Sequence, residues 1–218
     1  MKKILPSLLL CLSAFAEAQN YVFVHNHLDS GILSIDGNQF SINTVNAVGN
    51  LCEHSGIIKD NMAKDNDGCI VRFQFAGNHV KLDIPQSAAE ACRLKCGMNA
   101  RFDTDYRKEP PMCSQEGTTA MEKDFQTAYR GKKYRLAADI KEQYLNTCGE
   151  LLVLPDWMHT LNDLAVSWKN AGNKEACLST LDKMSPWLKG YQPSYIMEEE
   201  IKKETKAANF NRKQCSGK

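Results

Sequence analysis

An even set of eight cysteines, in a chain that begins like an exported protein, constrains this fold more than any other feature. The sequence holds nine cysteines, and Cys11 lies in a segment that resembles a secretory signal. An even count after such a signal favours structural disulfides over metal or redox chemistry. No Cys-x-x-Cys occurs, so the spacing of thioredoxin-like sites and zinc ribbons is missing. The remaining eight, all predicted to form disulfides, are Cys52, Cys69, Cys92, Cys96, Cys113, Cys148, Cys177 and Cys215.

Residues 1–18 have the layout of a signal peptide. Two lysines are followed by a mostly apolar run and by the small-x-small site Ala16-Glu17-Ala18. The apolar run is well short of the roughly 18 to 20 residues that span a bilayer, and no later stretch is apolar enough, so no membrane span is expected. A rival interpretation makes Cys11 a lipid-modified residue. We expect a mature chain that begins at Gln19 and is periplasmic or secreted, and the short signal favours a bacterial envelope.

The charge of the mature chain argues against nucleic acid as a partner. Removal of two lysines and one glutamate from the 27 basic and 26 acidic residues leaves 25 of each sign. A chain this neutral has no overall field that draws it to nucleic acid or to an anionic membrane. A local basic excess at the C-terminal end is interpreted as a solvated tail, and its residues are Lys202, Lys203, Lys206, Arg212, Lys213 and Lys218.

The first half of the mature chain has a β-like pattern. Short runs with alternating apolar residues are separated by turn signals, which predicts four to six antiparallel strands in a small sheet or partial barrel. The runs are 21–24, 32–35, 39–42, 69–75 and 79–84, and the turns are Asp36-Gly37-Asn38, Asn66-Asp67-Gly68 and Ala76-Gly77-Asn78. A short helix is expected over 86–95, ended by Gly97.

The second half has a helical period. The clearest stripe is Trp157, Leu161, Leu164, Ala165 and Trp168. The charged, Pro-rich segment 107–111 separates the two patterns and predicts a domain boundary. The sequence therefore predicts an α+β protein with a disulfide-stapled β domain over 19–108 and a helical-hairpin domain over 109–218. The last helix is expected over about 194–207.

Residues 161–177, closed by Pro186, resemble one tetratricopeptide repeat. That family places a small residue where Ala165 lies, an aromatic residue at Trp168 and a turn glycine at Gly172. A fainter copy covers 128–137 and has its glycine at Gly131. The resemblance extends over roughly 118–190 and implies stacked helical hairpins, with an irregular period.

The layout of helical hairpins restricts the disulfide pairing. In an antiparallel hairpin the start of one helix lies beside the end of the next, which pairs Cys113 with Cys148. The same rule pairs Cys177 with Cys215. Two cysteines on one face of the short helix, Cys92 and Cys96, bridge each other poorly, and each is expected to reach back to either Cys52 or Cys69.

Histidines near the mature N-terminus form the best metal candidate. His25 and His27 lie two residues apart, so in a strand they share a face. A third ligand from Glu53 or His54 has no diagnostic spacing, and the alternative is a polar edge strand. We expect no metal and no cofactor.

Candidate binding residues are easier to find than catalytic ones. No Gly-x-Ser-x-Gly occurs, and His159 is expected on the polar side of its helix. Trp187 follows Pro186 and belongs to no apolar stripe, which predicts a surface anchor. A loop dense in special residues follows Cys96 and is the second candidate surface, with Asn99, Arg101 and Phe102 as its contact residues.

The interpretation that fits these features best is a non-catalytic protein-binding protein of the bacterial envelope, of a type that restrains a wall-degrading enzyme or a toxin. In size and composition the first half is similar to small disulfide-bonded periplasmic inhibitor domains, although it shares no motif with them. Two alternatives remain, a peptidoglycan- or sugar-acting enzyme with scattered carboxylates and a helical-repeat adaptor. An enzyme predicts titratable groups converging in a pocket, whereas a binder predicts an exposed apolar patch.

Overall fold

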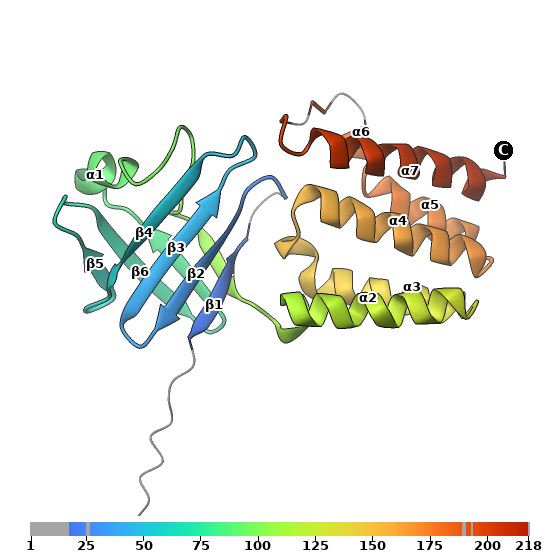
Figure 1. The fold of residues 1–218 in the computed structure, drawn as a ribbon, viewed down its shortest axis with the longest axis horizontal. Helices are drawn as coiled ribbons and strands as arrows, with labels where there is room; N and C mark the ends of the chain where they lie inside the picture. The colour runs from blue at the N-terminus through green and yellow to red at the C-terminus, as the bar shows by residue number, and fades with distance from the viewer. Residues whose placement is uncertain (1–17, 25–26, 189–190, 193, 218) are drawn as a thin grey trace, which may run out of the picture.

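The chain folds as an antiparallel sheet followed by a layer of helices, as Figure 1 shows. The computed structural model describes residues 18–24, 27–188, 191–192 and 194–217. The predicted signal segment, with Cys11, therefore lies almost entirely outside the described residues. Among those that are described, no helix has the length and apolar character needed to cross a membrane. The expectation of a mixed α+β fold with the sheet first is confirmed.

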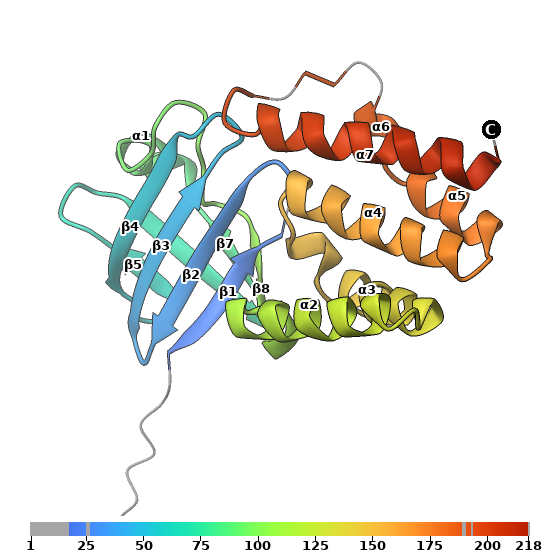
Figure 2. The ribbon, with the colours of Figure 1, turned by 45° about the vertical axis from the view of Figure 1, so that its right-hand side comes forward.

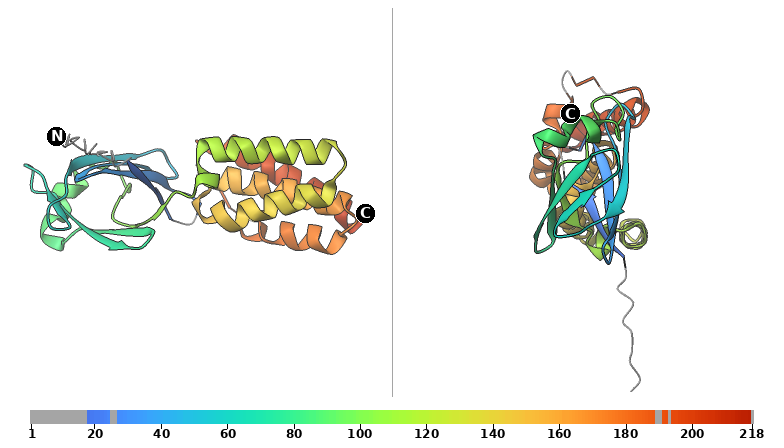
Figure 3. Two further views of the ribbon diagram at one scale, coloured as in Figure 1. Left: turned by 90° about the horizontal axis from the view of Figure 1, so that it is seen from below. Right: turned by 90° about the vertical axis from the view of Figure 1, so that its left-hand side faces the viewer.

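Within the part of the chain that the structure describes, the sheet has eight strands and curls back on itself. Its strand order is β4-β3-β2-β1-β8-β7-β6-β5, so β4 and β5 lie at opposite ends of the order. Only residues 58–61 connect these two strands, and a link this short brings both edges of the sheet together (Figure 3). The strands are β1 Gln19–Phe23, β2 Ser30–Asp36, β3 Gln39–Val45, β4 Leu51–Ile57, β5 Met62–Lys64, β6 Ile70–Ala76, β7 His79–Asp83 and β8 Asp105–Lys108.

Alternating side chains explain why these strands form and why the sheet closes. On β3, Phe40 and Ile42 point inward and are buried, and Phe73 on β6 meets Phe40 with ring centroids 5.0 Å apart. Inward residues of every strand thus join one core. The predicted turn at Gly37, with a φ of 57°, connects β2 to β3.

Two disulfides fasten a short helical segment across the seam between β4 and β5. The helix α1 spans Ala89–Arg93 and follows the 3-10 turn Gln86–Ala88. Cys92 bonds Cys69, which directly precedes β6, and Cys96 bonds Cys52 of β4. We call residues 92–96 the seam clip. The structure thus decides between the two pairings that the sequence left open.

The second half consists of antiparallel helices, which Figure 2 shows side by side. Helix α4 lies between α3 on one side and α5 and α7 on the other. The bounds are α2 Gln115–Arg130, α3 Tyr134–Cys148, α4 Leu154–Asn170, α5 Lys174–Asp182, α6 Ser185–Leu188 and α7 Glu198–Ser216, with 3-10 turns at Pro111–Cys113 and Gly149–Leu151.

Each half of the helical layer carries one disulfide. Cys113, at the start of α2, bonds Cys148 at the end of α3, and Cys177 in α5 bonds Cys215 in α7. These are the two pairs that the hairpin argument predicted. Gly172, with a φ of 84°, forms the turn between α4 and α5, as expected for a position that favours glycine.

The two halves contact each other through hydrogen bonds, a ring stack and an ion pair. The amide of Leu154 donates to the carbonyl oxygen of His27 at 2.7 Å, and the ring of His27 stacks on Trp157. Arg107 forms an ion pair with Glu150. At the other end of the junction, Ser194 donates to the carbonyl oxygen of Ala47.

Two element predictions need correction. Among the described residues the sheet has eight strands where four to six were expected, because β4, β5 and β8 lack an alternating apolar signal. The last of these strands, β8, ends at Lys108, within the range given to the β domain. The last helix begins at Glu198 and continues to Ser216, because Ala208 and Cys215 extend its buried face beyond 207.

Candidate functional site

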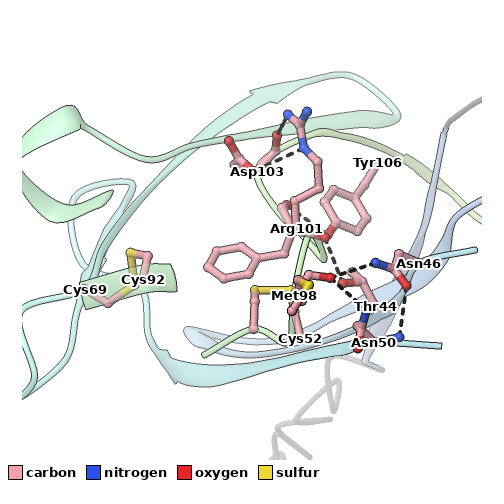
Figure 4. Close-up of a disulfide and its surroundings, with 12 residues drawn as sticks. Thr44, Asn46, Asn50, Cys52, Cys69, Cys92, Met98, Arg101, Asp103 and Tyr106 are labelled. Carbon is pink, nitrogen blue, oxygen red and sulfur yellow. Dashed lines mark hydrogen bonds and ion pairs between the residues drawn. A yellow bond between two sulfur atoms is a disulfide. The ribbon is translucent and has the colours of Figure 1, made fainter. Parts of the chain in front are cut away.

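The loop after the seam clip is a rigid surface element, shown in Figure 4. The side-chain amides of Asn46 and Asn50 both donate to the carbonyl oxygen of Met98, at 3.2 and 2.8 Å. Thr44 donates to the carbonyl oxygen of Arg101 at 2.8 Å. These bonds come from β3 and from the turn that follows it, so the sheet sets the shape of the loop.

The structure separates the three candidate contact residues of this loop. Asn99 is exposed and adopts a left-handed conformation with a φ of 59°. Arg101 is exposed and pairs with Asp103 at 3.3 Å. Phe102 is 1% exposed, and its ring stacks on His54. Phe102 is therefore a core residue, and its place in the predicted contact surface was wrong.

An aromatic groove lies between α6 and α7. Its volume is about 580 Å³, and its apolar lining consists of Trp187, Leu188, Tyr191, Ile201 and Phe210. The rings of Trp187 and Tyr191 meet edge to face with centroids 5.0 Å apart. Trp187 is half-buried, and Phe210 is 61% exposed although it is a large apolar side chain. Trp187, predicted as a surface anchor, thus lines an open apolar groove.

Lysines line the same groove. Lys202, Lys206 and Lys213 are exposed residues of α7 at spacings of four and seven, which places them on one helix face with Phe210. Lys202 pairs with Glu198. Among the described residues, no ion pair involves Lys206 or Lys213. The groove therefore combines aromatic surface with unpaired positive charge.

A charged network connects α2, α3, α4 and α7. The ammonium of Lys141, which is 1% exposed, lies 2.6 Å from Glu122 and 2.9 Å from Asp163. Burial raises the pKa of Glu122, but the hydrogen bonds from Lys141 and Gln126, together with the positive charge of Lys141, outweigh burial and hold this pKa below its usual range. The ammonium of Lys141 is held by these two carboxylates and also lies over the ring of Phe125, so we assign Lys141 a structural role.

His159 extends this network to the surface. The sequence placed it on the polar side of its helix, and the residue is indeed exposed. Its Nδ1 lies 3.2 Å from Glu204 and its Nε2 lies 3.5 Å from Asp163. The hydrogen bond to Glu204 raises the pKa of His159, against the effect of burial. His159 therefore binds α4 to α7.

Of the histidine pair that was weighed as a metal candidate in the sequence, only His27 lies among the described residues. His25 lies outside them. The Nδ1 of His27 donates to the carbonyl oxygen of Leu152 at 2.7 Å, so this atom is occupied at the junction. His54 lies in the core of the sheet, where its ring contacts Phe40 and Phe102.

A polar cleft opens at the seam between β4 and β5. It is lined by His54 and by charged groups from the seam edges and the clip, namely Glu53, Asp65, Asp67 and Lys95. Lys95 lies 2.8 Å from Asp65 and 2.6 Å from Asp67. The backbone amides of Asp67 and Cys69 also donate to Asp65, at 3.0 and 2.9 Å. Asp65 is thus fixed by three donors, which does not suit a general acid.

The sequence interpretation missed Phe210 and the cleft. The missed signal on α7 is a stripe at i, i+3, i+4, i+7, i+8 and i+11 that mixes lysine with one exposed aromatic residue. The cleft depends on the contact between β4 and β5, and neither of these strands was predicted from the sequence. No family model, no curated protein and no solved structure matches this chain.

Proposed function

We propose that this chain is an exported, non-catalytic binding protein that holds a segment of a protein partner in the groove between α6 and α7. The observation that carries the proposal is Phe210, a phenylalanine that is 61% exposed beside Trp187 and three lysines. Exposed aromatic residues at the centre of an apolar groove are typical anchors of protein interfaces. Four disulfides support an oxidising compartment, as expected for an exported chain.

The chemistry of the groove specifies its occupant as an acidic segment with apolar side chains. Apolar side chains of the partner cover Phe210 and Trp187, while its carboxylates face Lys206 and Lys213. Electrostatic complementarity of this kind selects partners by charge and raises the association rate. Within this proposal, a wall-degrading enzyme or a toxin of the envelope remains our preferred partner. The stacked hairpins of α2–α3 and α4–α5 support the tetratricopeptide-like alternative, an adaptor for envelope complexes.

A peptide titration of the mature, oxidised protein tests the groove. One synthetic amphipathic peptide carries leucine, phenylalanine and glutamate, and a second has the same sequence with lysine in place of glutamate. We expect the acidic peptide to bind and to change the tryptophan fluorescence, and the basic peptide to bind at least about tenfold more weakly. Phe210→Ser and Lys206→Glu should each weaken the acidic peptide by about tenfold.

Matched controls come from the β half. Ile57 is also 61% exposed, so Ile57→Ser removes the same amount of exposed apolar character far from the groove, and Lys64→Glu is the matched charge reversal. Both should bind like the wild type. Equal affinity for the two peptides, or groove variants that bind like the wild type, would refute the proposal. Binding to anionic lipid vesicles without binding to the acidic peptide would assign the groove to a lipid surface instead.

A further inference from the structure

A buried histidine nitrogen at the seam has no hydrogen-bond partner. His54 is 8% exposed, and its ring stacks on Phe102 and meets the edge of Phe40. Its Nε2 is buried, and among the described residues no group donates to it or accepts from it. Such a group loses its hydrogen bonds to water on burial, and this loss is unfavourable unless another partner replaces them. Because His54 lines the seam cleft, a ligand that enters the cleft would supply a partner for this nitrogen.

A fixed carboxylate lies near the ring of His54. One ring nitrogen of His54, one carboxylate oxygen of Asp65 and the sulfur of Cys69 all lie within 4.8 Å of one another. The sulfur is bonded to Cys92 and is no metal ligand in this state. Asp65 is oriented by the amides of Asp67 and Cys69, which fixes where its oxygens point.

The charge states of both groups suit a metal ion. Burial lowers the pKa of His54, which leaves the imidazole neutral with a free lone pair at neutral pH. Burial raises the pKa of Asp65, but the contacts from Lys95, Cys69 and Asp67 outweigh it and keep the group ionised. The cleft contains three carboxylates, counting Glu53, and one ammonium, so its net charge of about −2 matches a divalent cation.

We propose that the seam cleft binds an exchangeable divalent transition-metal ion through a ring nitrogen of His54 and the carboxylate of Asp65, with water completing the coordination. Imidazole and carboxylate are common ligands of Zn²⁺. A site with two protein ligands suits an ion that exchanges with solvent. The disulfides, and not the ion, stabilise the fold here. This site is independent of the groove on the helices.

Lys95 gives the proposal a distinctive signature. Its ammonium lies between Asp65 and Asp67, at 2.8 and 2.6 Å, so it competes with a cation for Asp65. When the ion binds, Lys95 keeps its partner Asp67. Replacing Lys95 with an uncharged side chain removes the competitor and should therefore strengthen the binding of the ion.

Zinc titration of the mature protein tests the site, with a chromophoric chelator as competitor and Zn²⁺ as the probe. A thiol assay first shows that all four disulfides are intact. We expect one Zn²⁺ per chain, an affinity at least about tenfold lower in His54→Gln and Asp65→Asn, and a higher affinity in Lys95→Met. The control is His79→Gln, which alters an exposed histidine of β7 and should bind like the wild type.

Three outcomes overturn the proposal. The first is that the wild type binds no Zn²⁺. The second is that His54→Gln binds Zn²⁺ as tightly as the wild type, which would assign the metal to other histidines. The third is that Lys95→Met binds Zn²⁺ more weakly than the wild type. Because His54 is buried, thermal denaturation must show that its variant is folded. If His54→Gln does not fold, Lys95→Met still tests the proposal, because a misfolded protein does not gain affinity for Zn²⁺.

Discussion

The two halves of this molecule use their disulfides in different ways. In the β half, the loop closed by Cys52–Cys96 encloses the loop closed by Cys69–Cys92, and both bridges hold the same seam clip. In the helical half, Cys113–Cys148 and Cys177–Cys215 follow each other without overlap. The two edge strands of the sheet are not neighbours in the strand order, so disulfides across the seam hold these edges together. The helices already pack on α4, and their disulfides link only their ends.

The largest expected effect on the free energy of unfolding comes from removing both disulfides of one half together. Each cysteine pair changed to alanine should cost ~2 to 4 kcal/mol of unfolding free energy. The outer loop, closed by Cys52–Cys96, spans 44 residues. The inner bridge, Cys69–Cys92, closes off 23 of them and so shortens the outer loop to about half. Since halving a loop saves ~0.6 kcal/mol of closure entropy, removal of both β-half bridges should cost ~0.6 kcal/mol more than the sum of the single removals.

The helical half provides the control for this measurement. Its two bridges close separate loops, so the costs of removing them should add within about 0.5 kcal/mol. Urea unfolding of the mature variants measures all of these free energies. Additive costs in both halves would contradict the role we give to the seam clip.

Lys141→Ala should destabilise the helical half by ~3 kcal/mol, because the carboxylates of Asp163 and Glu122 then lose their buried counter-ion. Lys203→Ala is the matched control, since Lys203 is exposed and lies 3.8 Å from its partner Glu204. It should cost less than about 0.5 kcal/mol. Urea unfolding at neutral pH measures both. A small loss in Lys141→Ala would show that water already reaches the pair.

A smaller effect on stability is expected at Gly117, where α2 begins after the sheet. A Cβ on Gly117 would lie 2.1 Å from the carbonyl oxygen of Pro111 and 2.7 Å from the Cα of Met112, whereas one on Gly149 would meet nothing closer than 3.9 Å. Gly117→Ala should therefore lower stability by about 1 to 3 kcal/mol. Gly149→Ala should be neutral or slightly stabilising, because alanine restricts the unfolded chain. Thermal melts of both variants check this, and equal melting temperatures would refute the close approach.

The smallest expected effect is a pH dependence that belongs to the helical half. The pKa of His159 is raised above 6.5 by its bond to Glu204, so the protonated form stabilises the fold. This contribution is complete below pH 6.5 and is lost as the pH rises through the raised pKa. Because His159 is half exposed, the contribution is at most about 1 kcal/mol.

Unfolding free energies of the wild type and His159→Gln, measured from pH 5 to pH 9, test this point. The wild type should lose more stability than the variant as the pH rises. Parallel curves would mean that His159 is not coupled to Glu204 in solution.

The sequence predicted those elements whose buried residues are apolar and regularly spaced. On β3 and β6 the alternation is clear, and α4 has a wide apolar stripe. β4 was missed because its inward side chains are Cys52, His54 and Gly56, which give no hydrophobic period. The C-terminal extension of α7 was missed because its buried side chains beyond 207 are Ala208 and Cys215, seven residues apart, and the large apolar residue between them, Phe210, is exposed.

The same limit explains the candidate sites. Trp187 could be selected because it belongs to no stripe, which is a local property of the sequence. Phe102 was selected because it lies in a loop dense in special residues, but His54 covers its ring from a strand that the sequence did not predict. Sites formed by contacts between distant segments, such as the seam cleft, require the closed sheet.

The nested loops of the β half also affect how this protein is made. In a chain exported as proposed, the N-terminal end emerges first, so Cys52 and Cys69 would reach the oxidant before Cys92 and Cys96. A bond between the first two would not be native, and thiol–disulfide exchange would have to replace it. In the helical half, by contrast, cysteines pair in the order in which they emerge. A host that oxidises thiols but lacks a disulfide isomerase should therefore secrete chains with correct helical bridges and scrambled β bridges.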